Sequence, residues 1–400
     1  MSIYHMSKRR IIQLTVITIL GIIVFRFFIF PPKVYDSSKT PFILRVRLKR
    51  SVDTFTLYSK GKCRVTDAEK GAVLARAFSF DGPREVSPAK SGMKFGQELF
   101  PSGDIRISPL RGKLLVVDGR PYRGEIDVQK KDKGFRIINR VKLEDYLKGV
   151  LPREVYHFWP FATLKAQAIA SRSFAAHQAL LRKNQDYDLT ADTFSQVYGG
   201  QASERWRTTK AVESTAGEVL EYDGKVLPAY FHSCCGGHTQ NAANLWSQHE
   251  DPLRGVKCSW CRWSPYFRWR VRIPTKTILE KLKEKGYSFR EIDDIRSGPR
   301  DNSKRVEYVR IRSQNNWFEV STEDFRAALG RRLLKSSNFK IKKYPYYYLF
   351  SGYGWGHGVG MCQWGSFGLG FRRWDYERIL RHYYPGTEIV NLSEVLRKER

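Results

Sequence analysis

The stretch that decides the fold is GVLPREVYHFWPFATLKAQAIASRSF, residues 149–174. Its only acidic residue, Glu154, lies in a short segment rich in proline and aromatic residues. Apolar residues recur at helical spacing after Pro160, and proline is favoured at the first position of a helix. The pattern therefore predicts a carboxylate in an aromatic loop, followed by a helix over residues 160–182.

Lys165 and Arg172 are two helical turns apart, so they share one face of this predicted helix. A carboxylate in a partly dry aromatic loop, beside a helix that presents cations, is typical of an acid/base site. The alternative is a surface glutamate near a helix start, where the helix dipole favours negative charge. The cations would lower the pKa of Glu154 if they were close, whereas a general acid needs a raised pKa. The sequence leaves this tension open.

The stretch resembles the signature of the SpoIID/LytB family, which reads roughly Val-Val-Pro-Ser-Glu-Met, then Trp-Pro, then Leu-Lys-Ala-Gln-Ala-Val-Ala-Ala-Arg-Thr-Tyr. Further segments match the family pattern in the same order, and the resemblance spans roughly residues 41–390. These segments are RPYRG at 120–124, LEDYL at 143–147, DTFSQVYG at 192–199, FHSCCGG at 231–237, GWGHGVGM at 354–361 and HYYPG at 382–386.

The resemblance implies a lytic transglycosylase that cuts the bond between N-acetylmuramic acid and N-acetylglucosamine in peptidoglycan, on glycan strands whose stem peptides have been removed. The family's catalytic acid maps onto Glu154. Such an enzyme needs one carboxylate, because the C6 hydroxyl of the muramic residue attacks its own C1 and yields a 1,6-anhydro product. An ordinary glycosidase needs two carboxylates. Asp192 is the nearest second candidate, and we interpret it as a capping or turn residue.

Other residues at family positions are expected to bind substrate. They are Lys165, Gln167, Arg172, Ser173, Gln196 and Tyr198. The alternative for the polar side chains is local hydrogen bonding, which buried polar groups need in any case. His357 and Gln363 lie in a glycine-rich segment whose backbone can approach a ligand closely, so they are expected to line the cleft. Family members usually carry Ser where this chain has Cys362.

The chain has six cysteines, and two of them form the pair Cys258-x-x-Cys261. Cys235 and His238 lie upstream with the same spacing. Together they predict a structural Cys₃His zinc site, which has no open position for water and so no part in the chemistry. Disulfides are the alternative in an oxidising compartment. A zinc hydrolase that uses this cluster is the weakest functional interpretation, since thiolate-rich closed sites are usually structural.

Residues 11–30 are almost continuously apolar and follow the basic run Lys8-Arg9-Arg10. Twenty such residues span one hydrocarbon core, which predicts an uncleaved membrane anchor with a cytoplasmic N-terminus and an exported remainder. A cleaved signal peptide is the alternative. The net charge of +30 favours polyanionic partners such as anionic lipid headgroups, but the chain shows no usual nucleic-acid motif. The membrane is therefore one expected partner, and the family resemblance implies two more, peptidoglycan strands and a cell-wall amidase.

We predict an α+β protein with seven segments. A cytoplasmic tail (1–10), the anchor (11–30) and a linker (31–41) precede a β-rich part of the SpoIID-like domain (42–141). A central helical catalytic core with flanking strands and the Cys/His cluster follows (142–273). An inserted α/β subdomain (274–345) then precedes a glycine-rich segment and a C-terminal helix that close the core (346–390). A second functional interpretation is a non-catalytic wall-binding protein that enhances a partner amidase.

Overall fold

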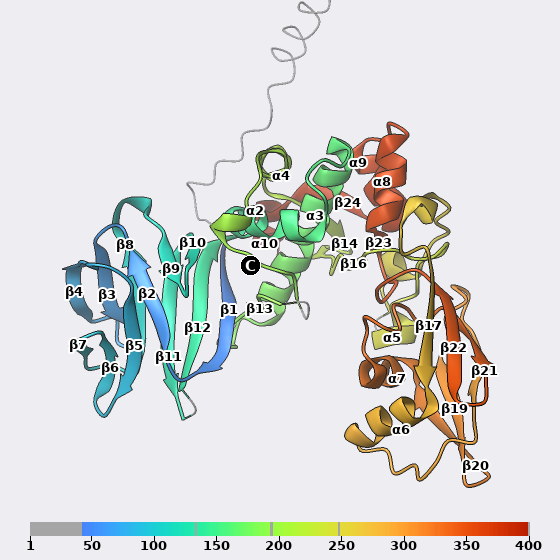
Figure 1. The fold of residues 1–400 in the computed structure, drawn as a ribbon. Helices are drawn as coiled ribbons and strands as arrows, with labels where there is room; N and C mark the ends of the chain where they lie inside the picture. The colour runs from blue at the N-terminus through green and yellow to red at the C-terminus, as the bar shows by residue number, and fades with distance from the viewer. Residues whose placement is uncertain (1–41, 133, 193–194, 247–248, 399–400) are drawn as a thin grey trace, which may run out of the picture. The chain divides into compact units, whose positions relative to one another are not determined.

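The computed structural model describes residues 42–398, apart from residues 133, 193–194 and 247–248. The predicted tail, anchor and linker (1–10, 11–30 and 31–41) lie outside the described residues. No helix in the described part of the chain is long and apolar enough to span a bilayer. The described chain is a mixture of strands and helices, which confirms the α+β class (Figure 1).

The β-rich part contains two sheets that share one hydrophobic core. Alternation of buried and exposed residues, as in Phe55–Ser59, places one face of each strand in this core. The larger sheet has the order β13 (Leu189–Thr190), β1 (Ile43–Val52), β12 (Gly134–Lys142), β11 (Glu125–Lys131), β8 (Asp104–Pro109), β3 (Cys63–Asp67) and β4 (Val73–Phe78). The smaller has the order β10 (Arg120–Tyr122), β9 (Leu115–Val117), β2 (Phe55–Ser59), β5 (Arg84–Ala89), β6 (Gly92–Phe95) and β7 (Glu98–Phe100).

The long helix α3 (Phe161–Leu181) is the centre of the helical core (Figure 1). It confirms the predicted helix at 160–182, with Pro160 as its N-cap residue rather than its first helical residue. The elements packed against it are α2 (Leu143–Glu154), α4 (Trp206–Glu213), α8 (Gln363–Phe371), α9 (Tyr376–Tyr383) and β14 (Glu218–Tyr222). Around these lie α5 (Ala243–Trp246), α10 (Leu392–Lys398) and the short strands β15 (Lys225–Val226), β16 (Phe231–His232), β23 (Met361–Cys362) and β24 (Glu388–Asn391). Residues from distant parts of the chain therefore meet around one helix.

Helix α2 corrects the expectation that Glu154 lies in a loop, because Glu154 is the last residue of this helix. Its apolar residues, Leu143, Tyr146, Leu147, Val150 and Leu151, are all buried and recur at helical spacing. Pro152 falls in the last turn, where a proline removes one hydrogen bond just before the helix ends.

Helix α8 corrects a second expectation, because the glycine-rich segment 352–370 was expected to have no helix. Its glycines permit close packing: a Cβ at Gly365 would lie 2.6 Å from Sγ of Cys258 and 2.0 Å from the hydroxyl oxygen of Tyr383. A Cβ at Gly368 would lie 2.4 Å from the carbonyl oxygen of Trp260. The glycines here mark close approach between elements rather than a loop.

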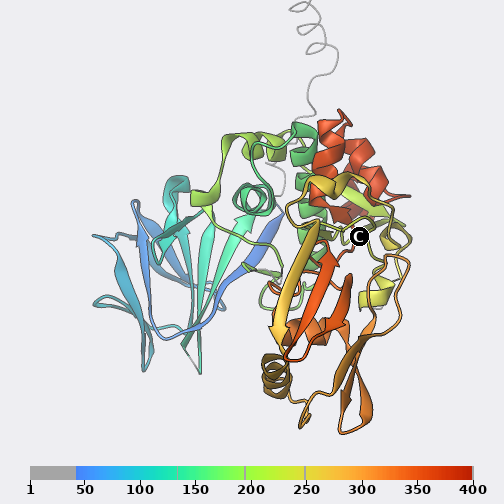
Figure 2. The same ribbon diagram turned by 45° about the vertical axis from the view of Figure 1, so that its right-hand side comes forward.

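The region predicted as an insertion at 274–345 has a hydrophobic core of its own, which extends from Trp269 to Phe350. One sheet consists of β17 (Arg268–Pro274), β22 (Tyr347–Tyr353) and β21 (Phe339–Lys343), whose strands lie side by side in Figure 2. Strands β18 (Asp294–Ser297), β19 (Tyr308–Ser313) and β20 (Asn316–Ser321) form another, with helices α6 (Thr275–Glu284) and α7 (Thr322–Leu329) packed nearby.

Candidate active site and metal centre

Glu154 is held at the end of α2 by two hydrogen-bond partners from distant segments. Its Oε1 accepts a hydrogen bond of 3.1 Å from the backbone N–H of Val197, and the side chain of Gln363 forms a second hydrogen bond to the carboxyl. Gln363 is the first residue of α8. The carboxyl is thus fixed between α2, the Ser195–Gly199 segment and α8.

Burial raises the pKa of Glu154, while the hydrogen bonds from Val197 and Gln363 oppose that rise. The carbonyl end of the α2 dipole also disfavours a negative charge at this position. The carboxyl itself is buried, although Glu154 as a whole residue is partly exposed. A carboxyl with a raised pKa can both donate and accept a proton.

Aromatic residues of the loop after Glu154 pack against one another and against Trp364 of α8. Trp159 is 3% exposed and its ring centroid lies 5.1 Å from that of Trp364 and 5.6 Å from that of Tyr156. Tyr156 and Phe158 stack at 5.3 Å, and both are largely exposed, at 51% and 65%. The exposed rings therefore form an apolar surface next to the carboxyl, of the kind on which sugar rings pack.

The two predicted cations do not point at the carboxyl. Arg172 is fully buried and forms a bidentate pair of 2.9 and 2.8 Å with Glu144. The ammonium of Lys165 lies over the ring of Tyr376, at 5.1 Å from its centroid. Among the described residues, neither cation contributes to the pKa of Glu154, so the tension left open by the sequence does not arise.

The other predicted polar residues form an internal network. The amide nitrogen of Gln196 donates to the carbonyl of Ser171, and its oxygen accepts from the hydroxyl of Tyr146. Glu154 raises the pKa of this tyrosine through its charge, although burial is the larger cause. Gln167 donates to the hydroxyl of Ser171, and its Oε1 is buried without a partner among the described residues. These side chains are buried and form hydrogen bonds within the protein.

Ser173 and Tyr198 also make structural contacts. The hydroxyl of Ser173 donates to the carbonyl of Ile169 and accepts from the N–H of Leu220. Tyr198 is 3% exposed, and its hydroxyl donates to Asn139 at 3.0 Å. Asp192 accepts a hydrogen bond of 2.7 Å from the hydroxyl of Thr190, which agrees with the turn role expected for it.

Part of the chain matches the model of a known family. The model of the family described as stage II sporulation protein, SpoIID, matches residues 131–222, which include Glu154 and Gln196. An uncharacterised protein of Brachyspira hyodysenteriae is 35% identical over 70% of this chain and 75% of its own length.

The chain belongs to the SpoIID family.

Two relatives in Bacillus subtilis carry informative names. The stage II sporulation protein D is 28% identical over 65% of this chain and 78% of its own length. The amidase enhancer is 29% identical over 72% of this chain, which spans about half (47%) of that relative's length. A domain of unknown function, DUF8618, matches residues 257–360. The region with its own core in this SpoIID family member, Trp269 to Phe350, therefore lies within that match.

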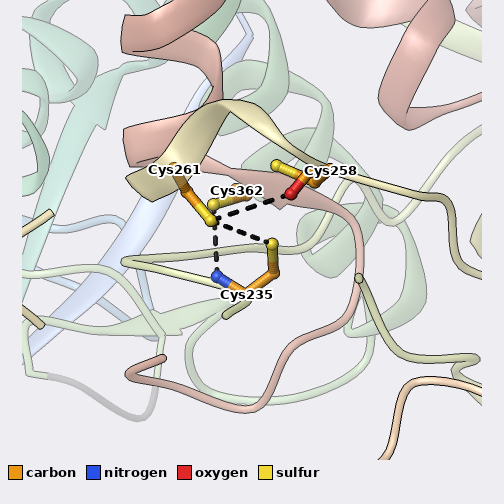
Figure 3. A group of neighbouring side chains, drawn as sticks. All are labelled: Cys235, Cys258, Cys261 and Cys362. Atoms are coloured by element: carbon orange, nitrogen blue, oxygen red, sulfur yellow. Dashed lines mark hydrogen bonds between the residues drawn. The ribbon is translucent and has the colours of Figure 1, made fainter. Parts of the chain in front are cut away.

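The candidate metal site of this SpoIID family member differs from the predicted ligand set. Sγ atoms of Cys235, Cys258, Cys261 and Cys362 all lie within 4.8 Å of one another and are buried (Figure 3). His238 is not in this group, and its Nδ1 lies 2.6 Å from the carbonyl of Thr239. Cys362 takes the fourth position, so the residue that departs from the usual family Ser belongs to the cluster.

The four thiols have the chemistry of a tetrahedral zinc site, in which Zn–S bonds of about 2.3 Å place sulfur atoms roughly 3.8 Å apart. Sγ of Cys235 and Sγ of Cys261 are 3.5 Å apart, and the cysteines in the described chain are free thiols. Backbone N–H groups of Cys235 and Gly365 donate to Sγ of Cys362, which is also the N-cap residue of α8. Both features oppose the rise in the pKa of Cys362 that burial and the neighbouring thiols cause.

Arg305 supplies a buried positive charge beside this cluster. Its side chain is fully buried, its guanidinium donates to the carbonyl of Cys235, and its Nε has no partner among the described residues. A buried cation without a carboxylate partner is costly. Four thiolates around Zn²⁺ carry a net charge of −2 and would compensate it. Arg305 therefore fits a metal-loaded tetrathiolate better than four neutral thiols, and sequence reasoning missed it because it lies far from the cysteines in the chain.

His357 lies beside an aromatic cavity of about 420 Å³. The cavity is lined by Phe174, Ser195, Tyr230, Phe231, Leu245, Trp246, Glu323, Arg331 and His357. The ring of His357 donates through Nε2 to the carbonyl of Phe231 and accepts through Nδ1 from the N–H of Val359. Burial lowers the pKa of His357 to about 4, so the ring is neutral and acts as a rigid wall. Glu323 and Arg331 come from the inserted region, and no sequence motif indicated them.

Proposed function

We propose that this SpoIID family member is a peptidoglycan lytic transglycosylase in which Glu154 is the one acid and base. The observation that carries the proposal is the carboxyl of Glu154: its pKa is raised by burial, it belongs to a partly exposed residue, and exposed aromatic rings follow it in the chain. In the described chain, no acidic side chain contributes to the pKa of Glu154. A mechanism with one carboxylate fits this setting, whereas a two-carboxylate glycosidase needs a partner within about 10 Å.

The reaction has two proton transfers at Glu154. The protonated carboxyl gives its proton to the glycosidic oxygen, and the bond from that oxygen to C1 of N-acetylmuramic acid breaks. The carboxylate then takes the proton of the muramic C6 hydroxyl while the C6 oxygen forms a bond to C1. The products are a 1,6-anhydromuramic end and a free hydroxyl on N-acetylglucosamine, and Glu154 is protonated again. Water is not a reactant.

The hydrogen bonds from Val197 and Gln363 and the burial of the carboxyl favour different protonation states of Glu154 in this cycle. The hydrogen bonds stabilise the carboxylate that forms after the first proton transfer. Burial stabilises the acid before it. The predicted substrate-binding role of Lys165, Gln167, Arg172, Ser173, Gln196 and Tyr198 becomes indirect in this proposal, because their side chains make contacts within the protein. His357 lines the aromatic cavity, and the buried Gln363 forms a hydrogen bond to the carboxyl of Glu154.

Glu154→Gln tests the proposal. The amide keeps an acceptor for the N–H of Val197 but cannot transfer a proton, so release of anhydro products from purified, stem-peptide-free glycan should fall about 10³-fold. Glu213→Gln, on the exposed face of α4, is the matched control and should keep parental activity. Equal product release by the Glu154→Gln variant and the parent would contradict the proposal.

We also propose that Zn²⁺ binds Cys235, Cys258, Cys261 and Cys362 as a structural ion. Zinc would hold β23 and the start of α8, and Gln363 directly follows Cys362. Metal analysis should find about one zinc per chain, and Cys362→Ser should lower both metal content and Tm. His238→Ala should leave metal content unchanged. Loss of zinc in the His238 variant with retention in the Cys362 variant would restore the ligand set predicted from sequence.

The name of one relative, amidase enhancer, favours a second function. In that case the chain would bind wall glycan and stimulate a partner amidase without cutting bonds itself. Glu154→Gln would then keep full stimulation of a cell-wall amidase while the parent releases no anhydro products. For either function we infer a place outside the cytoplasmic membrane with the N-terminus in the cytoplasm, because residues 11–30 are apolar and follow a basic run.

A further inference from the structure

One sheet of the inserted region has a basic outer face. The sheet consists of β17, β22 and β21, and its inner face contributes Trp269, Ile273 and Phe350 to the hydrophobic core of this region. Along each strand, more buried residues alternate with more exposed ones, because successive side chains point to opposite faces. The exposed cations of the outer face, which we term the basic sheet face, are Arg268, Arg270, Arg272, Lys340 and Lys342.

The strand register spreads these cations over two dimensions. Arg270 and Lys340 lie on either side of one residue of the central strand β22, and Arg272 and Lys342 lie on either side of the next outward-facing residue. Neighbouring strands are about 4.8 Å apart, and alternate residues of one strand are about 6.8 Å apart. The backbone positions of these four cations therefore form the corners of a rectangle of roughly 10 by 7 Å.

The charge of the basic sheet face is not neutralised by neighbouring acids. Residues 252–279 and 325–374, which contain the three strands, have 16 Lys and Arg residues and no Asp or Glu. Within the ranges that the structure describes, none of the five cations forms a salt bridge. The acids of β18 and α6, which are in contact with this sheet, each pair with a cation of their own element. The five cations are therefore available to an external anion.

Tyrosines accompany the cations on this face. The guanidinium groups of Arg268 and Arg272 lie 5.8 and 5.7 Å from the centroids of tyrosine rings of β22, in cation–π contact. Tyr346, in the turn between β21 and β22, is 85% exposed. Its carbonyl accepts a hydrogen bond of 3.0 Å from the N–H of Thr275, which holds the turn against the end of β17. A fixed turn thus presents an aromatic ring to solvent beside the cations.

This combination suits an anionic lipid surface better than a linear polyanion. Proteins that bind a linear polyanion such as a single nucleic-acid strand place their cations along a groove. Here the cations are spread over a sheet face, and a bilayer with anionic headgroups likewise presents its phosphates in two dimensions. Tyrosine is enriched at the membrane–water interface, because its ring is apolar and its hydroxyl remains hydrated.

We propose that the basic sheet face docks onto an anionic lipid bilayer, with the Tyr346 turn at the level of the headgroups. The inference goes beyond the reaction proposed for Glu154, because the face lies within residues 257–360, which match the domain of unknown function. The proposed anchor at residues 11–30 would keep the chain at the same membrane and so raise the effective concentration of lipid at this face.

The test is the rate at which an amine reagent labels Lys340 and Lys342 in the full chain, measured by mass spectrometry. The chain is placed in lipid nanodiscs of phosphatidylcholine alone or of an equimolar mixture with phosphatidylglycerol. Each cation near an anionic surface contributes about a fivefold gain in binding, so the two lysines should be labelled at least about fivefold more slowly in the anionic discs. Added salt should restore their rate. Lys94, an exposed lysine of β6, should react equally in both discs.

Two matched pairs of substitutions assign the effect to the basic sheet face. Arg270→Gln with Arg272→Gln should abolish the protection of the two lysines, because two lost cations weaken docking about 25-fold. Arg64→Gln with Arg76→Gln removes two exposed arginines from strands of the β-rich part and should preserve the protection. Tyr346→Ser should weaken it, because the ring at the turn is lost. The Tm of each variant should match that of the parent, since these side chains are exposed.

Equal labelling of Lys340 and Lys342 in neutral and anionic discs would overturn the inference, whatever the activity of Glu154. Protection that survives the double substitution in β17 would place the lipid contact elsewhere and also overturn it. Poly(glycerol phosphate), added to the neutral discs, separates lipid from a soluble phosphate polymer. Stronger protection by that polymer than by the anionic discs would show that the face binds a linear polyanion instead of a membrane.

Discussion

Glu154 and the four-cysteine cluster show two ways in which this protein keeps ionisable groups out of water. The carboxyl of Glu154 has a raised pKa, one backbone and one side-chain hydrogen bond, and belongs to a partly exposed residue. The four thiols are all buried, those of Cys235 and Cys362 accept hydrogen bonds from backbone N–H groups, and a buried arginine lies beside them. The first arrangement suits a group that exchanges a proton, whereas the second gathers four sulfur atoms in a set that fits a metal ion. Gln363 directly follows Cys362 in the chain and forms a hydrogen bond to the carboxyl of Glu154, so it links the cysteine cluster to the candidate active site.

Removing the buried charge of Arg305 should give the largest effect on stability. If the cluster is an anionic zinc tetrathiolate, Arg305→Met leaves that charge uncompensated and should lower the free energy of unfolding by about 3 kcal/mol. If the cysteines are neutral thiols, the same change removes an unpaired buried cation and should stabilise the protein. Denaturant unfolding of the parent and the variant, with and without a chelator, shows whether the substitution lowers or raises the free energy of unfolding.

Glu154→Gln should have a smaller effect on stability, in the opposite direction. The folded-state pKa of Glu154 lies above its unfolded value, so the folded state binds more protons between the two. Stability is therefore lost as pH rises from the unfolded pKa through the folded pKa. The glutamine does not titrate, so the Tm of the variant should exceed that of the parent at pH 8 and match it at pH 4. A lower Tm at pH 8 would show that Glu154 is a structural group.

Gln363→Leu should produce the smallest change, a shift in the pH profile. Its hydrogen bond lowers the pKa of Glu154, so its loss should raise that pKa further. A general acid works when protonated, and activity should then persist to higher pH on the alkaline limb of kcat/KM. Trp364→Phe, which keeps the neighbouring aromatic packing, is the control and should leave the pH of the alkaline limb of kcat/KM unchanged. A shift toward lower pH in the Gln363 variant would contradict the assigned hydrogen bond.

The sequence predicted those parts of the fold whose signals are local. Helix α3 follows from the apolar periodicity after Pro160. Helix α2 was not predicted, because Pro152 and the aromatic residues after it are typical of a loop. Helix α8 was not predicted, because glycine usually disfavours a helix, whereas here the glycines allow close packing against neighbouring elements. Each error arose where packing between distant elements outweighs local preference.

The candidate site was predictable only in part for the same reason. Glu154 and three of the four cysteines were found by motif and spacing. Cys362 and Arg305 are brought to the cluster by long-range packing, through the pairing of β16 with β23 and the burial of an arginine from the inserted region. The pairing of Arg172 with Glu144, rather than with Glu154 or substrate, was equally invisible in the sequence.

The central claim is that one carboxyl completes the reaction without water. Digestion of purified, stem-peptide-free glycan in water enriched in oxygen-18, followed by mass spectrometry of the fragments, tests it most directly. The account predicts 1,6-anhydromuramic ends without the heavy isotope. Reducing muramic ends that carry oxygen-18 at C1 would contradict it, because they would show that water attacks the anomeric carbon.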